Sequence, residues 1–190
     1  MDLFEAIEKR FSYRGPFLDQ SVPREDLRRV VQAGLCAPSG KNEQTTTFVI
    51  VDDPDLLRRI QALGAKNTAM QQAKAYIVCL TDKQPPATQS FQVEDCSAAV
   101  ENLLLALTAL GYASVWVDGW LRAEGRGETV ARLVGAPEGK IARVILPIGR
   151  AADPNPPRKA KKPFEERAWF NQYGAADCGG GFSEKKERGK

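Results

Sequence analysis

The stretch VEDCSAAVENLLLALTALG, residues 93–111, is the longest helical pattern in the sequence and decides the fold class. Apolar residues surround this helix on almost every side, and room for close neighbours is left by Ala98, Ala99, Ala106 and Ala109. A helix that is apolar nearly all round is buried by other elements. We therefore expect it at the centre of the domain or between two subunits.

Helical and extended patterns alternate irregularly around this central helix. Helical spacing is found at residues 1–10, 22–37, 53–64 and 127–137. Strands are predicted from apolar, β-branched runs at 45–53, 73–82, 112–117 and 142–149. Because the order lacks a strict strand–helix–strand repeat, it predicts an α+β fold.

The length and composition suit one domain with a substantial core. The chain has 190 residues, of which 43% are hydrophobic. We expect one domain over residues 1–168 and a partly disordered tail over 169–190, since the final stretch is rich in Gly and charge. No apolar run reaches the roughly 18 to 20 residues that cross a bilayer, so no membrane contact is expected.

Charge, histidine and cysteine content exclude several function classes. The net charge of +3 is far from that of a dedicated nucleic-acid binder. The sequence has no histidine, which excludes Ser/His, Cys/His and His–metal mechanisms. The cysteines are widely separated and form no CxxC pair; they are Cys36, Cys79, Cys96 and Cys178. This spacing predicts neither a metal site nor a disulfide framework, and it favours a cytoplasmic protein with free thiols.

The stretch RFSYR, residues 10–14, follows the first helical pattern. Arg10 and Arg14 offer two guanidinium groups and Ser12 offers a hydroxyl, which together form the donor set that a phosphate monoester needs. A solvated helix end with surface charges would look the same. From this stretch alone both interpretations stay open.

The stretch CAPSGKNEQ, residues 36–44, lies between a predicted helix and a predicted strand. Pro38 ends the helix, and Ser39 and Gly40 are expected to expose backbone N–H groups. Asn42 and Gln44 carry amides that match the mixed donor and acceptor edge of a heteroaromatic ring. An ordinary helix-to-strand loop has a similar composition.

The stretch PPRKAKKP, residues 156–163, is predicted to be extended, which would project Lys159 and Lys161 to one side. A charged surface linker explains it equally well. The basic segment 158–162, with Trp169 and Phe170 nearby, could also contact nucleic acid. No stacking platform is spaced for that role, so no nucleic-acid partner is expected.

The residues, order and spacing of these three stretches resemble the nitroreductase family of FMN-dependent oxidoreductases, over about residues 3–168. The resemblance implies a three-layer α/β/α sandwich with a mostly antiparallel sheet. It also implies a homodimer with FMN sites at the subunit interface. The run of Leu103, Leu104, Leu105 and Leu107 supports this expectation, since we expect a monomer to expose it.

The resemblance also implies roles for individual residues. In the family the first motif binds the FMN phosphate and ribityl chain, and the corresponding residues here are Arg10, Ser12 and Arg14, with Phe11 beside them. The second motif lies against the flavin from the partner subunit, and its residues here are Pro38, Ser39, Gly40, Asn42 and Gln44. Lys159 and Lys161 would close the phosphate site.

Two further positions follow from the same resemblance. Asn67 corresponds to a polar residue that can reach the flavin pyrimidine edge, although it could equally be a helix-ending residue. The loop of Val117, Asp118 and Gly119 corresponds to one that directs a backbone N–H at flavin N5, although a plain turn is equally consistent. Cationic groups that would favour the anionic reduced flavin are Arg14, Lys41 and Lys159.

The implied activity is an FMN-dependent NAD(P)H oxidoreductase. NADH or NADPH would deliver hydride to flavin N5, and a small electron-poor acceptor would then take it in a ping-pong sequence. Nitroaromatics, quinones, enones or flavins fit this description, and no protein nucleophile or metal is required. The alternatives are a specialised branch that performs reductive dehalogenation or flavin cleavage, and a flavin-binding protein without turnover. Thr45–Thr47 replace a frequent Pro-Trp pair, and the 117–119 loop lacks a Glu-Gly pair, so the sequence leaves subgroup and substrate open.

Overall fold

The computed structural model describes residues 1–84 and 91–175. The chain forms two compact units, Met1–Pro156 and Pro157–Lys190. Within the described residues, no helix has the length and apolar character needed to cross a membrane. Most of the predicted loose tail, including Cys178, falls at 176–190 and lies outside the described residues.

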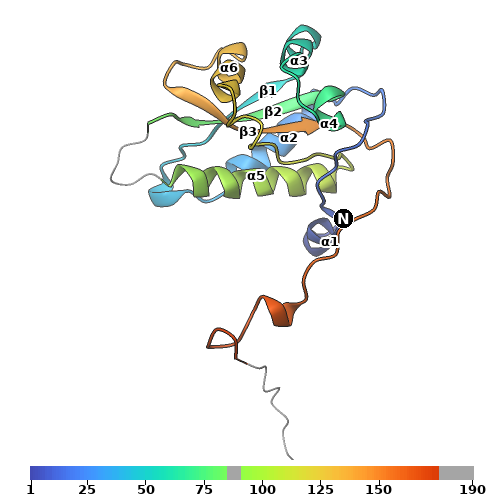
Figure 1. Ribbon diagram of the computed structural model, residues 1–190, viewed down its shortest axis with the longest axis vertical. Helices are drawn as coiled ribbons and strands as arrows, with labels where there is room; N and C mark the ends of the chain where they lie inside the picture. Colours follow the sequence, from blue (N-terminus) through green and yellow to red (C-terminus); the bar gives the residue numbers. More distant parts are fainter. Residues whose placement is uncertain (85–90, 176–190) are drawn as a thin grey trace, which may run out of the picture. The chain divides into compact units, whose positions relative to one another are not determined.

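A three-stranded sheet forms the centre of the first unit (Figure 1). Its strands are β1 (Thr47–Val51), β2 (Ala75–Asp82) and β3 (Lys140–Ile148), in the order β1-β2-β3. Both pairings are antiparallel, with Val49 opposite Val78 and Ile77 opposite Leu146. Three of the four predicted strands and the α+β class are confirmed.

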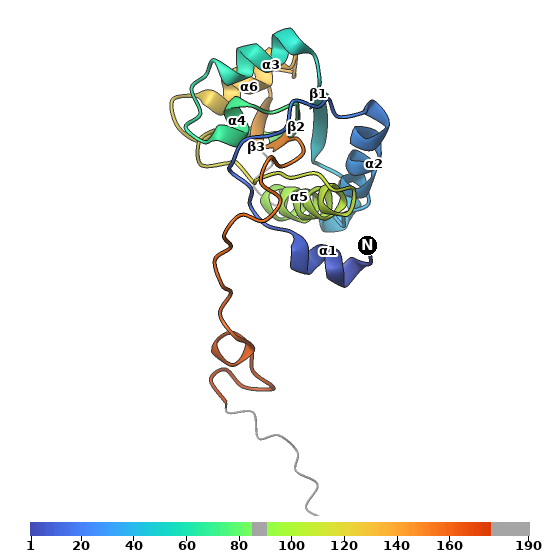
Figure 2. The same ribbon diagram turned by 90° about the vertical axis from the view of Figure 1, so that its right-hand side faces the viewer.

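Helices cover both faces of this sheet (Figures 1 and 2). The helices of this unit are α1 (Leu3–Lys9), α2 (Arg24–Leu35), α3 (Pro54–Gln61), α4 (Thr68–Gln71), α5 (Gln92–Ala109) and α6 (Arg126–Leu133). Of these, α1 packs against α5 and not against the sheet (Figure 2). Alternate side chains of β2 point to opposite faces, as strand geometry requires. Tyr76 and Val78 pack with α3, α4 and α6, whereas Ile77 and Cys79 pack with α2 and α5.

The central helix prediction is confirmed by α5, but its leucines correct the expectation about a monomer. Leu103, Leu104 and Leu107 are buried within the single chain, and Leu105 is half-buried. The reason is that α2 and the sheet cover one side of α5 while α1 lies against another (Figure 2). Large apolar residues are instead exposed on the two helices next to α5: Leu3, Phe4 and Ile7 on α1, and Leu35 at the end of α2.

The strand predicted at 112–117 is wrong, and Pro147 gives the physical reason. Ala113 pairs with Gly149 and Val117 pairs with Ile145, both as isolated antiparallel bridges beside β3. If the same register continued between these two bridges, Val115 would lie opposite Pro147, at a position where the two residues would exchange backbone hydrogen bonds. Proline has no N–H, so the ladder is interrupted at this pair and no continuous strand forms.

The described part of the second unit, residues 157–175, contains one short 3-10 helix, Phe164–Glu166. Lys162 forms an ion pair with Glu166 at 3.1 Å within this unit. Aromatic contacts join Phe164 to Phe170 and Trp169 to Tyr173. Residues 157–163 carry no helix or strand, which agrees with the extended segment that the sequence predicts.

Candidate functional site

The segment 10–14 leaves the end of α1 in an extended conformation. Arg10 is the C-cap of α1, with φ −61° and ψ 126°, and its N–H donates to the Ala6 carbonyl at 2.9 Å. Tyr13 is buried in the core and anchors the segment. Ser12 and Arg14 are exposed, and Arg14 Nη1 donates to the Ser12 carbonyl at 3.3 Å. The two arginines and the serine therefore lie on one short segment that the core holds in place.

Arg10 also has a carboxylate neighbour. Its Nε lies 3.1 Å from Glu101 Oε1, on the face of α5 toward α1. Glu101 could not be recognised from the sequence, because an acidic residue in an otherwise apolar helix is typically an ordinary solvent-exposed residue. The structure thus brings Arg10 together with an acid from a position about ninety residues further along the chain.

Ser114 is a second residue of this region that the sequence motifs do not predict. It forms a parallel bridge with Ser12, and its carbonyl accepts the Tyr13 N–H at 2.8 Å. Ser114 is only 4% exposed, and its hydroxyl has no hydrogen-bond partner among the residues that the structure describes. A small cavity beside it is lined by Lys9, Arg10 and Phe11 together with residues of α5. A buried hydroxyl without a partner requires an explanation, and a polar ligand in this cavity would provide one.

The loop 36–44 has a strained backbone. Lys41, Asn42 and Gln44 all have positive φ, at 53°, 58° and 51°. Asn tolerates this left-handed region, but Lys and Gln rarely adopt it. Strain of this kind persists only where surrounding contacts impose it, and such positions cluster at ligand sites.

Asp95 of α5 supplies the contacts that impose the conformation of this loop. Its carboxylate is buried and accepts the Gly40 N–H at 2.8 Å and the Thr45 hydroxyl at 3.0 Å. The expectation that Gly40 exposes its N–H is therefore wrong, because Asp95 uses that donor. A Cβ at Gly40 would lie 2.2 Å from Phe91, so glycine is needed here for close approach.

The amide side chains predicted for ring recognition are exposed, and Gln44 also borders a cavity under the loop. Asn42 and Gln44 are exposed, and the Gln44 N–H donates to Ser39 Oγ at 3.0 Å. A cavity of about 400 Å³ opens under the loop, between α2, α5 and the start of β1. Its polar lining includes Ser39, Gln44 and Asp95. Pro38 also lines it.

Asn67 and the 117–119 loop each have part of their hydrogen-bonding capacity already used. Asn67 is the N-cap of α4 and accepts the Met70 N–H at 2.7 Å, which leaves its amide NH₂ as a donor. The Val117 N–H donates to the Ile145 carbonyl at 3.3 Å. Asp118 and Gly119 are therefore the better candidates for a free backbone N–H, and nothing lies within 4 Å of where a Gly119 Cβ would be.

Lys159 and Lys161 belong to the second unit, where both side chains are exposed. The neighbouring Lys162 forms an ion pair with Glu166. Lys41, in the first unit, is also exposed.

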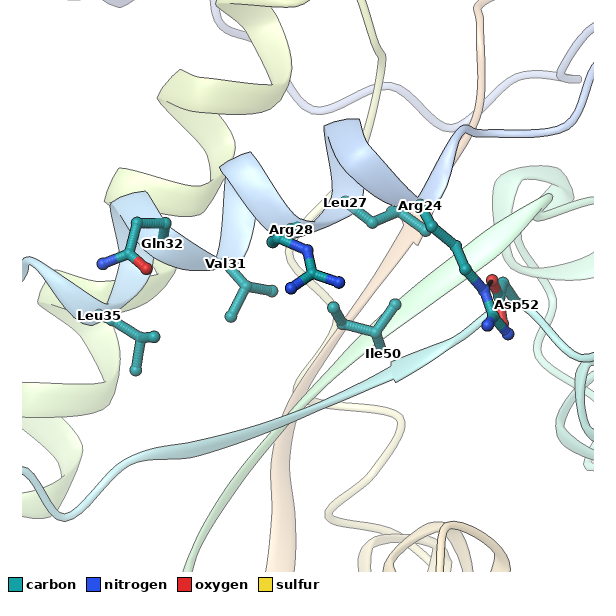
Figure 3. Close-up of a pocket in the computed structure, with 8 residues that line it drawn as sticks. All are labelled: Arg24, Leu27, Arg28, Val31, Gln32, Leu35, Ile50 and Asp52. Carbon is teal, nitrogen blue, oxygen red and sulfur yellow. Dashed lines mark hydrogen bonds and ion pairs between the residues drawn. The ribbon is translucent and has the colours of Figure 1, made fainter.

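A further cavity of about 350 Å³ lies between α2 and β1 (Figure 3). Leu27, Val31 and Ile50 form its apolar lining, and Arg24 binds Asp52 through two hydrogen bonds, of 2.5 and 2.9 Å, at one end. These hydrogen bonds lower the pKa of the Asp52 carboxyl. None of the predicted site residues lines this cavity.

The buried thiols of Cys79 and Cys96 lie in the core between β2 and α5. Burial raises the pKa of Cys79 well above its usual range, and the hydrogen bond from Cys79 lowers the pKa of Cys96. Both thiols are free. Across residues 1–84 and 91–175, no group of three or more Cys, Asp or Glu side chains is placed to hold a metal ion.

Comparison with known proteins identifies relatives along most of the chain. The model of the Nitroreductase family matches residues 7–68 and 61–150. A protein of Methanothermobacter thermautotrophicus, named as a candidate NADH dehydrogenase/NAD(P)H nitroreductase, is 33% identical over 153 residues, which are 80% of this chain and 79% of the relative. The iodotyrosine deiodinase of Thermotoga neapolitana is 27% identical over 179 residues, covering 81% of this chain and 91% of that protein.

Solved structures share the fold. A candidate NADH dehydrogenase/NAD(P)H nitroreductase from Bacteroides thetaiotaomicron superposes with a TM-score of 0.76 and 30% identity, over 90% of this chain and 98% of that one. A candidate nitroreductase from Desulfovibrio desulfuricans, solved in complex with FMN, has a TM-score of 0.70 and 25% identity, over 86% of this chain and 93% of that one.

Proposed function

The chain belongs to the Nitroreductase family, and from this premise we propose that it reduces small electron-poor acceptors with electrons that NAD(P)H supplies through FMN. It is an FMN-dependent oxidoreductase. Bound FMN would supply the centre that accepts hydride from NAD(P)H and returns it to the acceptor, in a ping-pong sequence. Nitroaromatics, quinones, enones and free flavins are the acceptor classes that this chemistry admits.

The observation that carries the cofactor assignment is the segment 10–14. Arg10, Ser12 and Arg14 provide charge-assisted donors on one core-anchored stretch, and the unpartnered Ser114 hydroxyl lies beside it. This donor set fits a phosphate monoester. Lys159 and Lys161 would complete the charge balance around the phosphate.

The remaining predicted residues would hold the flavin ring. The loop carrying Pro38, Ser39, Gly40, Asn42 and Gln44 would lie against the ring from the partner subunit, with Asp95 fixing the loop rather than touching the ring. The free amide of Asn67 would donate to the pyrimidine edge. The N–H groups of Asp118 and Gly119 would point toward N5, and Phe11 would pack beside the ribityl chain.

The assembly that supports this site is a homodimer. We propose that the helices on both faces of the sheet form a three-layer α/β/α sandwich that is completed in the dimer. We also propose that residues 157–168 belong functionally to the FMN domain, since they carry Lys159 and Lys161. The free thiols of Cys36, Cys79 and Cys96 suit a reducing, cytoplasmic compartment.

Reductive dehalogenation is a second candidate function. Similarity to the Thermotoga neapolitana iodotyrosine deiodinase over most of both chains favours it. It would use the same FMN site with a different acceptor, so the two candidates differ only in the reaction that follows reduction.

The experiment combines spectroscopy with one pair of variants. We expect the purified protein to show a flavin band near 450 nm, and we expect anaerobic mixing with NADH or NADPH to bleach it. Oxidation by a nitroaromatic, a quinone or iodotyrosine would then identify the acceptor class. A protein that binds FMN but is not bleached by either nucleotide would be a flavin binder without turnover.

Arg10→Ala tests the phosphate assignment. Loss of a charge-assisted hydrogen bond of about 1.5–3 kcal/mol should weaken FMN binding roughly 10- to 150-fold. Arg59→Ala, an exposed arginine of α3, serves as the control and should retain full flavin content. Full flavin content in Arg10→Ala would show that Arg10 does not bind the phosphate.

A further inference from the structure

Arg10 is restrained at its backbone and at its side chain. Its N–H donates to the Ala6 carbonyl at the C-cap of α1, and this hydrogen bond fixes the position of the Arg10 backbone. Its side chain is only 21% exposed and lies beside Leu104, Leu107 and Thr108 of α5. The aliphatic stem therefore has little freedom, and the orientation of the guanidinium depends on what its polar end contacts.

Glu101 is that contact. Its Oε1 lies 3.1 Å from Arg10 Nε, and it projects from α5 one turn before Leu104. The carboxylate approaches at Nε, and within residues 1–84 and 91–175 no hydrogen bond involves the two Nη groups at the far end of the guanidinium, so these groups remain available. Among the described residues, this is the ion pair that Arg10 makes.

From this geometry we propose that Glu101 is a positioning residue, which orients the Arg10 guanidinium so that its Nη fork is presented to the FMN phosphate. The inference rests on the proposed function, and it assigns Glu101 no contact with the cofactor. Without Glu101, Arg10 would have to be ordered by the phosphate itself, and binding would lose the free energy spent on that ordering.

The opposite role is also physically possible and gives the opposite result. A carboxylate close to Arg10 could compete with the phosphate for the same guanidinium, or repel it through space. If so, any substitution that removes the charge of Glu101 would tighten FMN binding. If Glu101 positions Arg10, removing the acceptor weakens binding, whereas a neutral acceptor of the same shape largely preserves it.

The test measures dissociation constants of FMN and riboflavin by equilibrium dialysis, with the full-length chain freed of flavin, at low ionic strength. We expect Glu101→Ala to weaken FMN binding about twofold to fivefold, which is the size of effect that a partly exposed ion pair can have. Riboflavin lacks the phosphate, so its affinity should not change. Glu101→Gln should stay close to wild type for FMN.

Two controls separate positioning from general effects. Glu94→Gln and Glu94→Ala change an exposed acid of the same helix and should leave both affinities unchanged. In the Arg10→Ala background, Glu101→Ala should have no further effect on FMN, because the residue it positions is absent.

The inference is overturned if Glu101→Ala leaves FMN affinity unchanged or tightens it, if riboflavin affinity falls in parallel, or if the Glu101 effect persists without Arg10. A failure of the proposed function looks different. In that case the wild-type chain binds no FMN, or binds FMN and riboflavin equally, and both the function and this inference fall together.

Discussion

Asp95 shows how one buried carboxylate can set the shape of a loop fifty residues away in sequence. Its two oxygens accept from the Gly40 N–H and the Thr45 hydroxyl, and the loop between these donors has three residues with positive φ. Hydrogen bonds to a charged acceptor are worth about 1.5–3 kcal/mol each. The backbone strain of the three residues is about 1–3 kcal/mol each. Both hydrogen bonds are therefore needed to offset it.

We accordingly expect Asp95→Ala to lower the free energy of unfolding by at least about 2 kcal/mol, because it leaves both donors without their acceptor. Asp95→Asn keeps one carbonyl acceptor and should cost about half as much. Urea denaturation of the two variants measures both values. Glu94→Ala, next to Asp95 but exposed, should lie within the error of wild type. Equal stability of Asp95→Ala and wild type would mean that the loop does not depend on this carboxylate.

At the scale of elements, the helices α2 and α5 meet at a glycine. A Cβ at Gly34 would lie 2.7 Å from Leu103 Cδ2, closer than two carbon atoms can pack. The helix-propensity gain of about 1 kcal/mol for Gly→Ala is opposed by an overpacking cost of about 1–3 kcal/mol. This contact explains why the sequence carries a glycine inside a helix that would otherwise favour alanine.

Gly34→Ala should therefore destabilise the protein by about 1 kcal/mol despite its better helix propensity. Thermal or urea unfolding measures the change, and Gly139→Ala is the matched control, since nothing lies within 4 Å of a Cβ at that position. In the Leu103→Ala background the cost should shrink or change sign, because the clashing side chain is gone. A stabilised Gly34→Ala protein would contradict the close packing of the two helices.

The elements also show which features sequence patterns can predict. Helical spacing and β-branched runs identified α2, α5, β1 and β2, because burial on a fixed period leaves a mark in the sequence. The strand at 112–117 was predicted for the same reason, but its pairing depends on Pro147, a residue thirty positions later in the partner strand. The spacing of apolar residues in one strand gives no information about whether the residues of its partner strand can form hydrogen bonds.

The candidate site likewise contains residues that the sequence can predict and residues that it cannot. The donor residues of segment 10–14 and the loop 36–44 could be found from residue type and spacing. Glu101, Asp95 and Ser114 could not, because each acts on a residue far away in sequence and none belongs to a local motif. The use of the Gly40 N–H by Asp95 is likewise visible only once the fold brings α5 under the loop.

At the scale of the whole molecule, the apolar face of α1 is exposed in the single chain and would be buried by a partner surface. Leu3, Phe4 and Ile7 are 62%, 76% and 48% exposed, although α1 also packs against α5. Adjacent large apolar side chains this exposed are typical of an interaction surface. A second copy of the chain fits the proposed homodimer, in which loop 36–44 of each subunit would meet the flavin of the other.

Phe4→Glu places a charge in the centre of this face and should convert the dimer to a monomer, which sedimentation velocity over a range of concentrations will detect. Burying an unpaired carboxylate in an apolar interface costs several kcal/mol, so dissociation should be complete at micromolar protein. Leu18→Glu, at an exposed apolar residue outside α1, is the control and should remain dimeric. If the interface also completes the site, flavin content should fall with dimerisation in Phe4→Glu while α-helical circular dichroism is retained. A wild-type monomer that keeps its FMN, or a Phe4→Glu dimer, would show that α1 does not form the subunit interface.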